Sequence, residues 1–194
     1  MRTRITVFCG SSTGNDPAYV ETATALGTEM ARRGIGLVYG GAQIGLMGAV
    51  ADACLAAGGE VTGVIPGFLG SKEIAHPGLT ELHRVDSMHE RKLMMHSLSN
   101  GAIALPGGFG TFEELFELLT WAQLGLHSQP IGLLNIKGYY DALQQLVEGA
   151  VGQGFIRAPH AALLRVHTSI PELMDSMRVP AEPQEPVLLD GERT

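Results

Sequence analysis

The stretch PGGFGTFEE, residues 106–114, combines glycines with carboxylates in a pattern that could bind a phosphate. Its three glycines let the backbone approach a ligand closely and turn N–H groups toward it, and the hydroxyl of Thr111 follows at an expected helix start. It is not a Walker A loop, because no lysine follows the glycines, and Glu113 stands where the dinucleotide fingerprint requires its third glycine. The alternative interpretation is a plain glycine-rich turn from a strand into a helix.

Glu114 has two interpretations that the local sequence leaves open. Thr111 and Glu114 have the spacing of a capping box, in which the carboxylate would bond back to the backbone N–H of Thr111. If a phosphate takes the backbone N–H groups instead, Glu114 faces the cleft beside a sugar. A carboxylate there can stabilise an oxocarbenium ion and orient a water molecule. Glu113 is expected to face solvent.

A second charged pattern occurs in SMHERK, residues 87–92. Ser87 and Glu90 have capping-box spacing, which places Arg91 and Lys92 at the end of the first helical turn. Cations at that end of a helix oppose its dipole, at a cost of about 0.3–1 kcal/mol each. The pattern therefore indicates either a bound anion or side chains that extend into solvent.

Two further patterns are weaker. YGGAQIGLMG, residues 39–48, is a second glycine-rich stretch before a helix, with Gly40 and Gly41 as its candidate ligand contacts. His89 and His96 are seven residues apart, which does not support a helical metal pair. The neighbouring apolar positions are expected to belong to the core, namely Met94, Met95 and Leu98.

The elements that must position these residues form a repeating pattern of short apolar runs and amphipathic runs. We expect strands over 4–10, 35–41, 60–66, 81–86, 102–106, 130–135 and 163–167, and helices over 17–33, 44–59, 87–100, 111–125, 138–152 and 170–177. Strands that are apolar throughout and are followed by helices predict an α/β fold with a doubly wound parallel sheet, a Rossmann-like three-layer sandwich. Ligands of such folds bind beyond the carboxyl ends of the strands, where all the motifs above are placed.

Composition narrows the function classes. The 194 residues carry 13 Lys and Arg against 20 Asp and Glu, a net charge of −7, so we expect no nucleic-acid partner and no membrane surface partner. No segment has the length and apolarity of a signal or transmembrane span. Cys9 and Cys54 have no metal-ligand spacing, so we interpret both as small buried hydrophobic residues in a cytoplasmic protein. Residues 1–178 are expected to form a single Rossmann-like nucleotide-binding domain, and the Pro- and acid-rich tail 179–194 is expected to be loose.

Taken together, these motifs resemble the LOG ("Lonely guy") family of cytokinin-activating phosphoribohydrolases. PGGFGTFEE matches the PGGxGTxxE signature, and VFCGSS, LVYGGAQIGLMG, GVIPGFL, MHERK and TWAQLG occur in the family's order within about residues 4–155. The resemblance implies a homodimer that hydrolyses the N-glycosidic bond of N6-modified adenosine 5'-monophosphates. The products would be the free base and ribose 5-phosphate, and no metal or redox cofactor would be used.

Carried over by position, Arg91 and Glu114 resemble the family's catalytic pair. In this mechanism, Glu114 stabilises positive charge at the anomeric carbon and positions the water, while Arg91 orients the nucleotide. The resemblance and the motifs give a nucleotide-binding set of Ser11, Gly41, Glu73, Lys92, Gly107, Gly108, Phe109, Gly110, Thr111, Glu113 and Thr120.

Other functions remain open on the sequence. A molybdenum-cofactor carrier is similar around the glycine signature but cleaves nothing, and it would not need Glu114. A broader purine-nucleotide hydrolase acting on plain AMP would look the same, because no motif marks a pocket for the N6 substituent. A lysine decarboxylase would need a lysine that forms a Schiff base with pyridoxal phosphate, and the available lysines have no convincing setting for it, namely Lys72, Lys92 and Lys137. The helix 111–125 could contribute a dimer contact through Phe116, Leu118 and Trp121.

Overall fold

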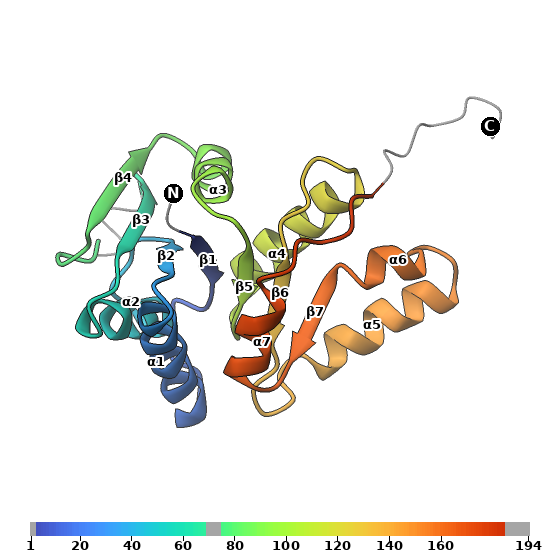
Figure 1. Ribbon diagram of the computed structural model, residues 1–194, viewed down its shortest axis with the longest axis horizontal. Coiled ribbons are helices and arrows are strands. Elements are labelled where there is room, and N and C mark those ends of the chain that lie inside the picture. The colour runs from blue at the N-terminus through green and yellow to red at the C-terminus, as the bar shows by residue number, and fades with distance from the viewer. Residues whose placement is uncertain (1–2, 69–74, 185–194) are drawn as a thin grey trace.

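The computed structural model describes residues 3–68 and 75–184. Seven strands form one parallel sheet in the order β4-β3-β2-β1-β5-β6-β7 (Figure 1). The strands are β1 (Arg4–Phe8), β2 (Gly36–Tyr39), β3 (Val61–Pro66), β4 (Glu81–Val85), β5 (Ala102–Ala104), β6 (Ile131–Leu134) and β7 (Leu164–His167). All seven lie within the ranges expected from the apolar runs, so the prediction of an α/β parallel sheet is confirmed.

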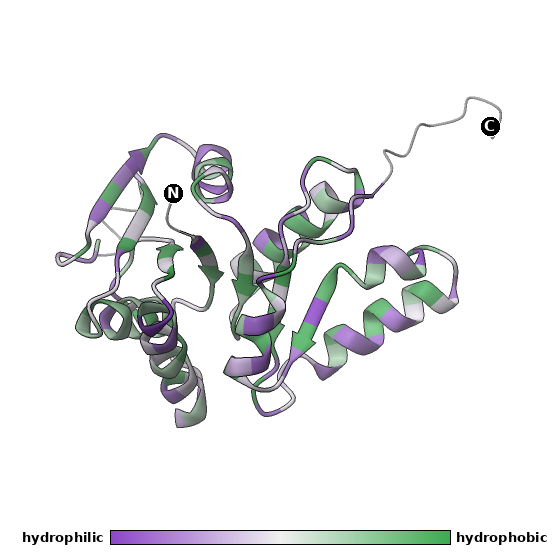
Figure 2. Ribbon diagram, in the orientation of Figure 1, coloured by the Kyte–Doolittle hydropathy of each residue, from purple (hydrophilic) through white to green (hydrophobic). Residues whose placement is uncertain are grey.

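Helices cover both faces of the sheet. They are α1 (Pro17–Arg32), α2 (Gly45–Ala56), α3 (Met88–Ser97), α4 (Phe109–Gln123), α5 (Asp141–Gly152), α6 (Ala158–Ala161) and α7 (Ile170–Ser176). Successive strand residues point to opposite faces, and the core is divided accordingly. Val7 and Leu37 belong to the cluster under α1, α2 and α7, whereas Phe8 and Val38 belong to the cluster under α3 and α4. This is the three-layer sandwich that the sequence predicted, and Figure 2 shows more hydrophilic residues on the edge strand β4 than on the strands in the middle of the sheet.

Local sequence signals explain where α1 begins and ends. The Asp16 carboxylate accepts a hydrogen bond of 2.9 Å from the Ala18 N–H, and Pro17 occupies the first helical position, where its missing N–H costs nothing. Gly34 follows the helix with a φ of 69°, a conformation that glycine adopts without strain.

α4 begins two residues earlier than predicted, and this changes the role of Thr111. Gly108 is the N-cap and Phe109 the first helical residue, so Thr111 lies inside the first turn. A capping box requires its hydroxyl residue at the N-cap. The capping-box interpretation of Thr111 and Glu114 is therefore wrong. The short helix α6 was also not predicted.

The C-terminal segment begins against the body of the domain. The Ala181 N–H donates to the Ser128 carbonyl at 2.9 Å, and the Arg165 guanidinium donates to the carbonyls of Val179 and Pro180. Residues 185–194 lie outside the described part of the chain, so the predicted loose tail stays a prediction. No helix within residues 3–68 and 75–184 is long and apolar enough to cross a membrane.

The sheet order places the topological switch point at β1. The chain runs outward from β1 through β2 and β3 on one side, and through β5 and β6 on the other. The loops after β1 and β5 therefore lead to opposite sides of the sheet. Doubly wound proteins bind their ligands in the crevice between such loops. The motifs that carry chemistry follow β1, β2, β4 and β5 and meet at this edge.

Close packing of α1 on α2 leads to a prediction about stability. A Cβ atom on Gly27 would lie 2.3 Å from the Val50 carbonyl oxygen, whereas a Cβ atom on Gly149 of α5 would have no neighbour within 4 Å. We expect Gly27→Ala to lower the free energy of unfolding by about 1–3 kcal/mol, because the two helices must separate. Gly149→Ala serves as the matched control and should raise the free energy of unfolding by up to about 1 kcal/mol. Urea unfolding of the two variants measures both effects, and equal effects would contradict the packing argument.

Candidate active site

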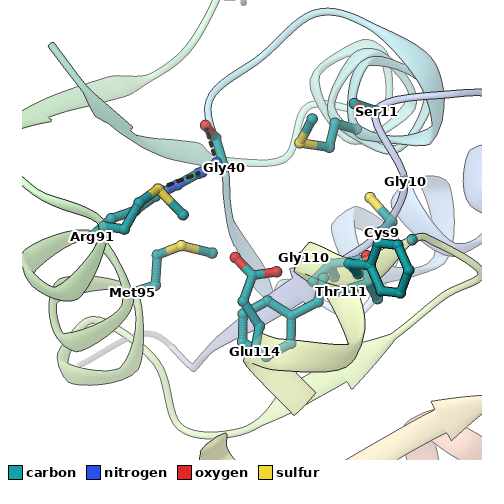
Figure 3. Close-up of a pocket in the computed structure, with 15 residues that line it drawn as sticks. Cys9, Gly10, Ser11, Gly40, Arg91, Met95, Gly110, Thr111 and Glu114 are labelled. Carbon is teal, nitrogen blue, oxygen red and sulfur yellow. Dashed lines mark hydrogen bonds between the residues drawn. The ribbon is translucent and has the colours of Figure 1, made fainter. Parts of the chain in front are cut away.

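A cavity of about 290 Å³ opens at the carboxyl ends of the central strands (Figure 3). Four segments that are distant in sequence form its walls, as the sequence predicted: the loop after β1, the end of β2, α3, and the start of α4. Its polar and glycine residues are Gly10, Ser11, Gly40, Arg91, Gly108, Gly110, Thr111 and Glu114. Such a volume is at the lower end of the range for small-molecule sites.

The Arg91 guanidinium is fixed in the cavity wall by the sheet. Ser87 caps α3 by accepting a hydrogen bond of 3.1 Å from the Glu90 N–H, which places Arg91 one turn into the helix. Arg91 is only 6% exposed. Its Nε donates to the Val64 carbonyl at 3.0 Å and its Nη2 to the Gly40 carbonyl at 2.8 Å. Its Nη1 donates to the Met88 sulfur at 3.8 Å. Arginine carries five N–H donors, so two of them are left for a ligand.

Gly40 makes this arrangement of Arg91 sterically feasible. A Cβ atom at position 40 would lie 2.0 Å from Nη2 of Arg91, far inside van der Waals contact. Gly41 has a φ of 81° and does not line the cavity, and a Cβ atom there would approach Ile65 instead. Of the two glycines that the sequence offered as ligand contacts, the structure places Gly40 at the cavity.

Glu114 projects into the same cavity from α4 (Figure 3). Among the residues the structure describes, none donates a hydrogen bond to its carboxylate, and Arg91 lies beyond ion-pair distance. Burial raises the pKa of Glu114 to about 7, the positive charges of Arg91 and Lys92 oppose the rise, and Glu113 and Glu117 add to it. A carboxyl group with such a pKa exchanges a proton near neutral pH, as catalytic acids and bases do.

The start of α4 has the geometry of an anion site. The first intrahelical hydrogen bond in this segment runs from the Phe112 N–H to the Gly108 carbonyl, so the preceding N–H groups have no helical partner. Cβ atoms added at Gly108 and Gly110 would meet no atom within 4 Å, which leaves open space beside this backbone. Gly107 has a different role, because a Cβ atom there would lie 2.1 Å from the Thr111 hydroxyl oxygen. Phe109 lines the cavity mouth and is 92% exposed.

Several predicted nucleotide contacts lie outside the cavity of this chain. Lys92 is buried and pairs with Glu113 and Glu117 of α4. The Thr120 hydroxyl donates to the Phe116 carbonyl at 2.7 Å on an exposed side of α4. Glu73 lies outside the described residues. For these positions, nucleotide contact stays a prediction.

The cavity also has a sulfur-rich wall that sequence reasoning missed, formed by Cys9, Met47, Met88 and Met95. Met95 was expected to be core alone, and it is both core and cavity wall. The signal was present in the spacing, because Met88, Arg91 and Met95 fall on one helical face at i, i+3 and i+7. Burial, and secondarily the Glu114 charge, raises the pKa of the Cys9 thiol, so Cys9 is a neutral wall residue rather than a nucleophile.

Metal and pyridoxal chemistry find little support in the described side chains. Within residues 3–68 and 75–184, no three His, Cys, Asp or Glu side chains are grouped as metal ligands. The described lysines are Lys92 and Lys137, and neither lines the cavity. Lys137 is largely exposed and lies 3.7 Å from Asp16.

Comparison with known proteins gives the family. A family model described as "Possible lysine decarboxylase" matches residues 47–177. The chain is 47% identical over 174 residues to the rice protein "Probable cytokinin riboside 5'-monophosphate phosphoribohydrolase LOGL9", covering 90% of this chain and 77% of that protein. It is 52% identical over 153 residues to Arabidopsis thaliana "Cytokinin riboside 5'-monophosphate phosphoribohydrolase LOG1", covering 79% and 72%. The chain belongs to the LOG family.

Solved structures agree on the fold of this LOG family member. The molybdenum cofactor carrier protein of Chlamydomonas reinhardtii superposes with a TM-score of 0.70 at 19% identity, covering 92% of this chain and 97% of that chain. The molybdenum cofactor binding protein of Rippkaea orientalis gives 0.68 at 21% identity, covering 92% and 99%. At such identities the likeness concerns the fold alone. The decarboxylase description of the family model does not fit the cavity, because a Schiff-base lysine is required and the described lysines lie elsewhere.

The contact between Gly40 and Arg91 leads to a prediction about site electrostatics. Gly40→Ala should displace the guanidinium and move its positive charge away from Glu114. Since that charge lowers the pKa of Glu114, we expect the pKa to rise above about 7 in the variant. Carboxyl ¹³C NMR titration of Glu114 measures this change, with Gly149→Ala as a remote glycine control. An unchanged pKa would show that the guanidinium tolerates the added methyl group.

Proposed function

We propose that this chain hydrolyses the N-glycosidic bond of adenosine 5'-monophosphates that carry an N6 substituent, releasing the free base and ribose 5-phosphate. The observation that carries the proposal is Glu114, a half-buried carboxylate without a hydrogen-bond partner among the described residues, which shares one cavity with a helix N-terminus and with Arg91. The LOG relatives of rice and Arabidopsis are named for this reaction.

The 5'-phosphate would bind at the start of α4. Backbone N–H groups of Phe109, Gly110 and Thr111 are free of helical partners there, and the helix dipole favours an anion. The open space beside Gly108 and Gly110 admits the phosphate oxygens. Holding the phosphate at one end of the cavity fixes the ribose beside Glu114, so that the reaction gains from positioning.

Glu114 then acts on the anomeric carbon. As the C1'–N9 bond breaks, its electron pair leaves with the purine and positive charge develops on the ribose ring. The ionised Glu114 stabilises that charge, and the carboxylate takes a proton from the water whose oxygen bonds to C1'. The purine anion becomes neutral by taking up one proton, and Glu114 returns to its ionised form by releasing the proton it took from the water, so that the water is divided between the ribose, as OH, and the base, as H. No protein group blocks this role, because Glu114 accepts no hydrogen bond from the described residues.

Arg91 supplies a fixed positive charge rather than a proton, because a guanidinium stays protonated. Its anchoring by Gly40 and Val64 means that little reorganisation is needed when substrate binds. We place it against the purine or the ribose, where it orients the nucleotide and stabilises negative charge developing on the leaving base.

We further propose that the protein is a cytoplasmic homodimer. None of the residues of α5 is buried within this chain, although the helix carries apolar positions along its length (Figure 2). Phe116, Leu146 and Phe155 are exposed large apolar residues on α4, on α5 and after α5. A second copy packed over these elements would cover them. Both cysteines, Cys9 and Cys54, are buried as thiols, which supports a reducing compartment.

The proposed reaction can be tested directly on the purified protein. Purified protein incubated with N6-isopentenyl-AMP should release the free base and ribose 5-phosphate in equal amounts, measured by liquid chromatography with mass spectrometry. Glu114→Gln removes the negative charge at nearly constant shape, and we expect it to lower kcat by about 10²–10⁴-fold. Plain AMP run in parallel gives the breadth of the substrate range. No release from either nucleotide by folded protein would reject the hydrolase and favour a nucleotide carrier.

The ionisation of Glu114 should make kcat depend on pH. Only the ionised form of Glu114 stabilises the developing positive charge, so kcat should rise with pH through the pKa of about 7 and level off above it. One unit below that pKa, roughly a tenth of the enzyme is ionised and kcat should fall about tenfold. Because the substrate phosphate also titrates near pH 6, binding of unreacted AMP to Glu114→Gln over the same range serves as the control. A kcat that increases toward lower pH would mean that the protonated carboxyl acts.

A further inference from the structure

On both α3 and α4, one residue lines the cavity while its neighbour in the sequence lies outside it. Arg91 and Lys92 are consecutive on α3, and Glu113 and Glu114 are consecutive on α4. Arg91 and Glu114 line the cavity, whereas Lys92 and Glu113 lie outside it and pair with each other. Glu117, one helical turn beyond Glu113, accepts a second hydrogen bond from Lys92 Nζ at 3.0 Å. The cavity pair is thus backed by a second layer of charge, the triad of Lys92, Glu113 and Glu117.

This triad joins the two helices that carry the cavity pair. Among the described residues, no ion pairs other than its own connect α3 with α4. Arg91 is held independently, because the carbonyls of Gly40 and Val64 fix its guanidinium to the sheet. Glu114 has no such anchor, so its distance from Arg91 depends on where α4 lies relative to α3.

The Lys92 side chain is buried, so its charge depends on these carboxylate partners for stabilisation. Its side chain is 7% exposed, against 53% for Glu113 and 23% for Glu117. Burial alone would lower the pKa of Lys92, but its hydrogen bonds to Glu113 and Glu117 raise it above the ordinary value. Leaving a buried cation without its partners is strongly unfavourable, so the triad resists being pulled apart.

We propose that Lys92, Glu113 and Glu117 form a charged brace between α3 and α4 that positions the Glu114 carboxylate relative to Arg91 and balances the charge around it, without contacting the nucleotide. For catalysis this inference rests on the proposed function. Lys92 is then a positioning residue. The alternative carried by the family resemblance is that Lys92 binds the nucleotide directly.

The electrostatic part follows from the charges that face Glu114. Arg91 and Lys92 face it from α3, Glu113 and Glu117 from its own helix, and the neutral Cys9 thiol from the loop directly after β1. Lys92 lowers the pKa of Glu114, whereas Glu113 and Glu117 raise it. Removing the lysine or a carboxylate of the brace should therefore shift Glu114 in opposite directions, which a brace with only a packing role would not do.

The test compares Lys92→Met, Glu113→Gln and Glu117→Gln with the wild type. Carboxyl ¹³C NMR titration follows Glu114 directly, and kcat and KM are measured for N6-isopentenyl-AMP across pH 5.5–8.5. Arg33→Met is the matched control, because Arg33 also pairs with two carboxylates, Glu29 and Asp175, on α1 and α7 away from the cavity.

We expect the pKa of Glu114 to rise by about half a unit to one unit in Lys92→Met and to fall by a similar amount in Glu117→Gln. The rising limb of the kcat profile should move with it, while KM for N6-isopentenyl-AMP changes less than about threefold. Arg33→Met should leave both the limb and KM as in the wild type.

The contrary result is equally specific. A rise of tenfold or more in KM for Lys92→Met, with an unshifted Glu114 and no effect of Glu117→Gln, would make Lys92 a nucleotide ligand and overturn the brace. If Lys92→Met does not fold, the downward shift in Glu113→Gln and Glu117→Gln decides alone. If the wild type hydrolyses no nucleotide, the proposed function fails, but the NMR titration still tests the brace, and unshifted variants would reject it.

Discussion

The constraint on which the site depends is the partial burial of one carboxylate, Glu114, that has no hydrogen-bond partner among the described residues. Removing an ionised carboxylate from water is costly unless other groups compensate. In this chain the compensation comes from charges close by rather than from hydrogen bonds to Glu114. Arg91 and Lys92 oppose the pKa rise that burial causes, and the net result is a group that titrates near neutral pH. Removal of the carboxylate from water both raises its pKa and lowers the stability of the fold.

The fold positions the charged groups of the site largely through backbone groups. The carbonyls of Gly40, directly after β2, and of Val64, within β3, hold Arg91. The first residues of α4 line the cavity, and Gly40 leaves room for the guanidinium. Backbone groups at strand and helix ends are positioned by the sheet as a whole. A doubly wound sheet brings such ends together at its switch point, which explains why a site of few side chains can be well ordered.

The same scaffold also occurs in proteins of different function. Molybdenum cofactor carriers share the fold at about one-fifth identity, whereas the LOG relatives share nearly half of their residues with this chain. A phosphate seat at a helix N-terminus is useful to a carrier and to a hydrolase alike. Cleavage additionally requires a group that stabilises charge on the sugar, the role that we propose for Glu114 with Arg91 in this chain. Function therefore depends on the site and not on the fold.

The sequence by itself determined the alternation of strands and helices and the loops that meet at the sheet edge, because periodicity and glycine spacing are local properties. Local pattern left the role of Glu114 open, and the pair of Arg91 and Glu114 came from the family resemblance. It missed α6, whose four residues are too short for a periodic signal, and it placed Thr111 at a cap that Gly108 occupies. Consecutive helical residues point roughly 100° apart. Which of Glu113 and Glu114 enters the cavity is therefore set by how α4 is rotated against the sheet, and only tertiary packing decides that.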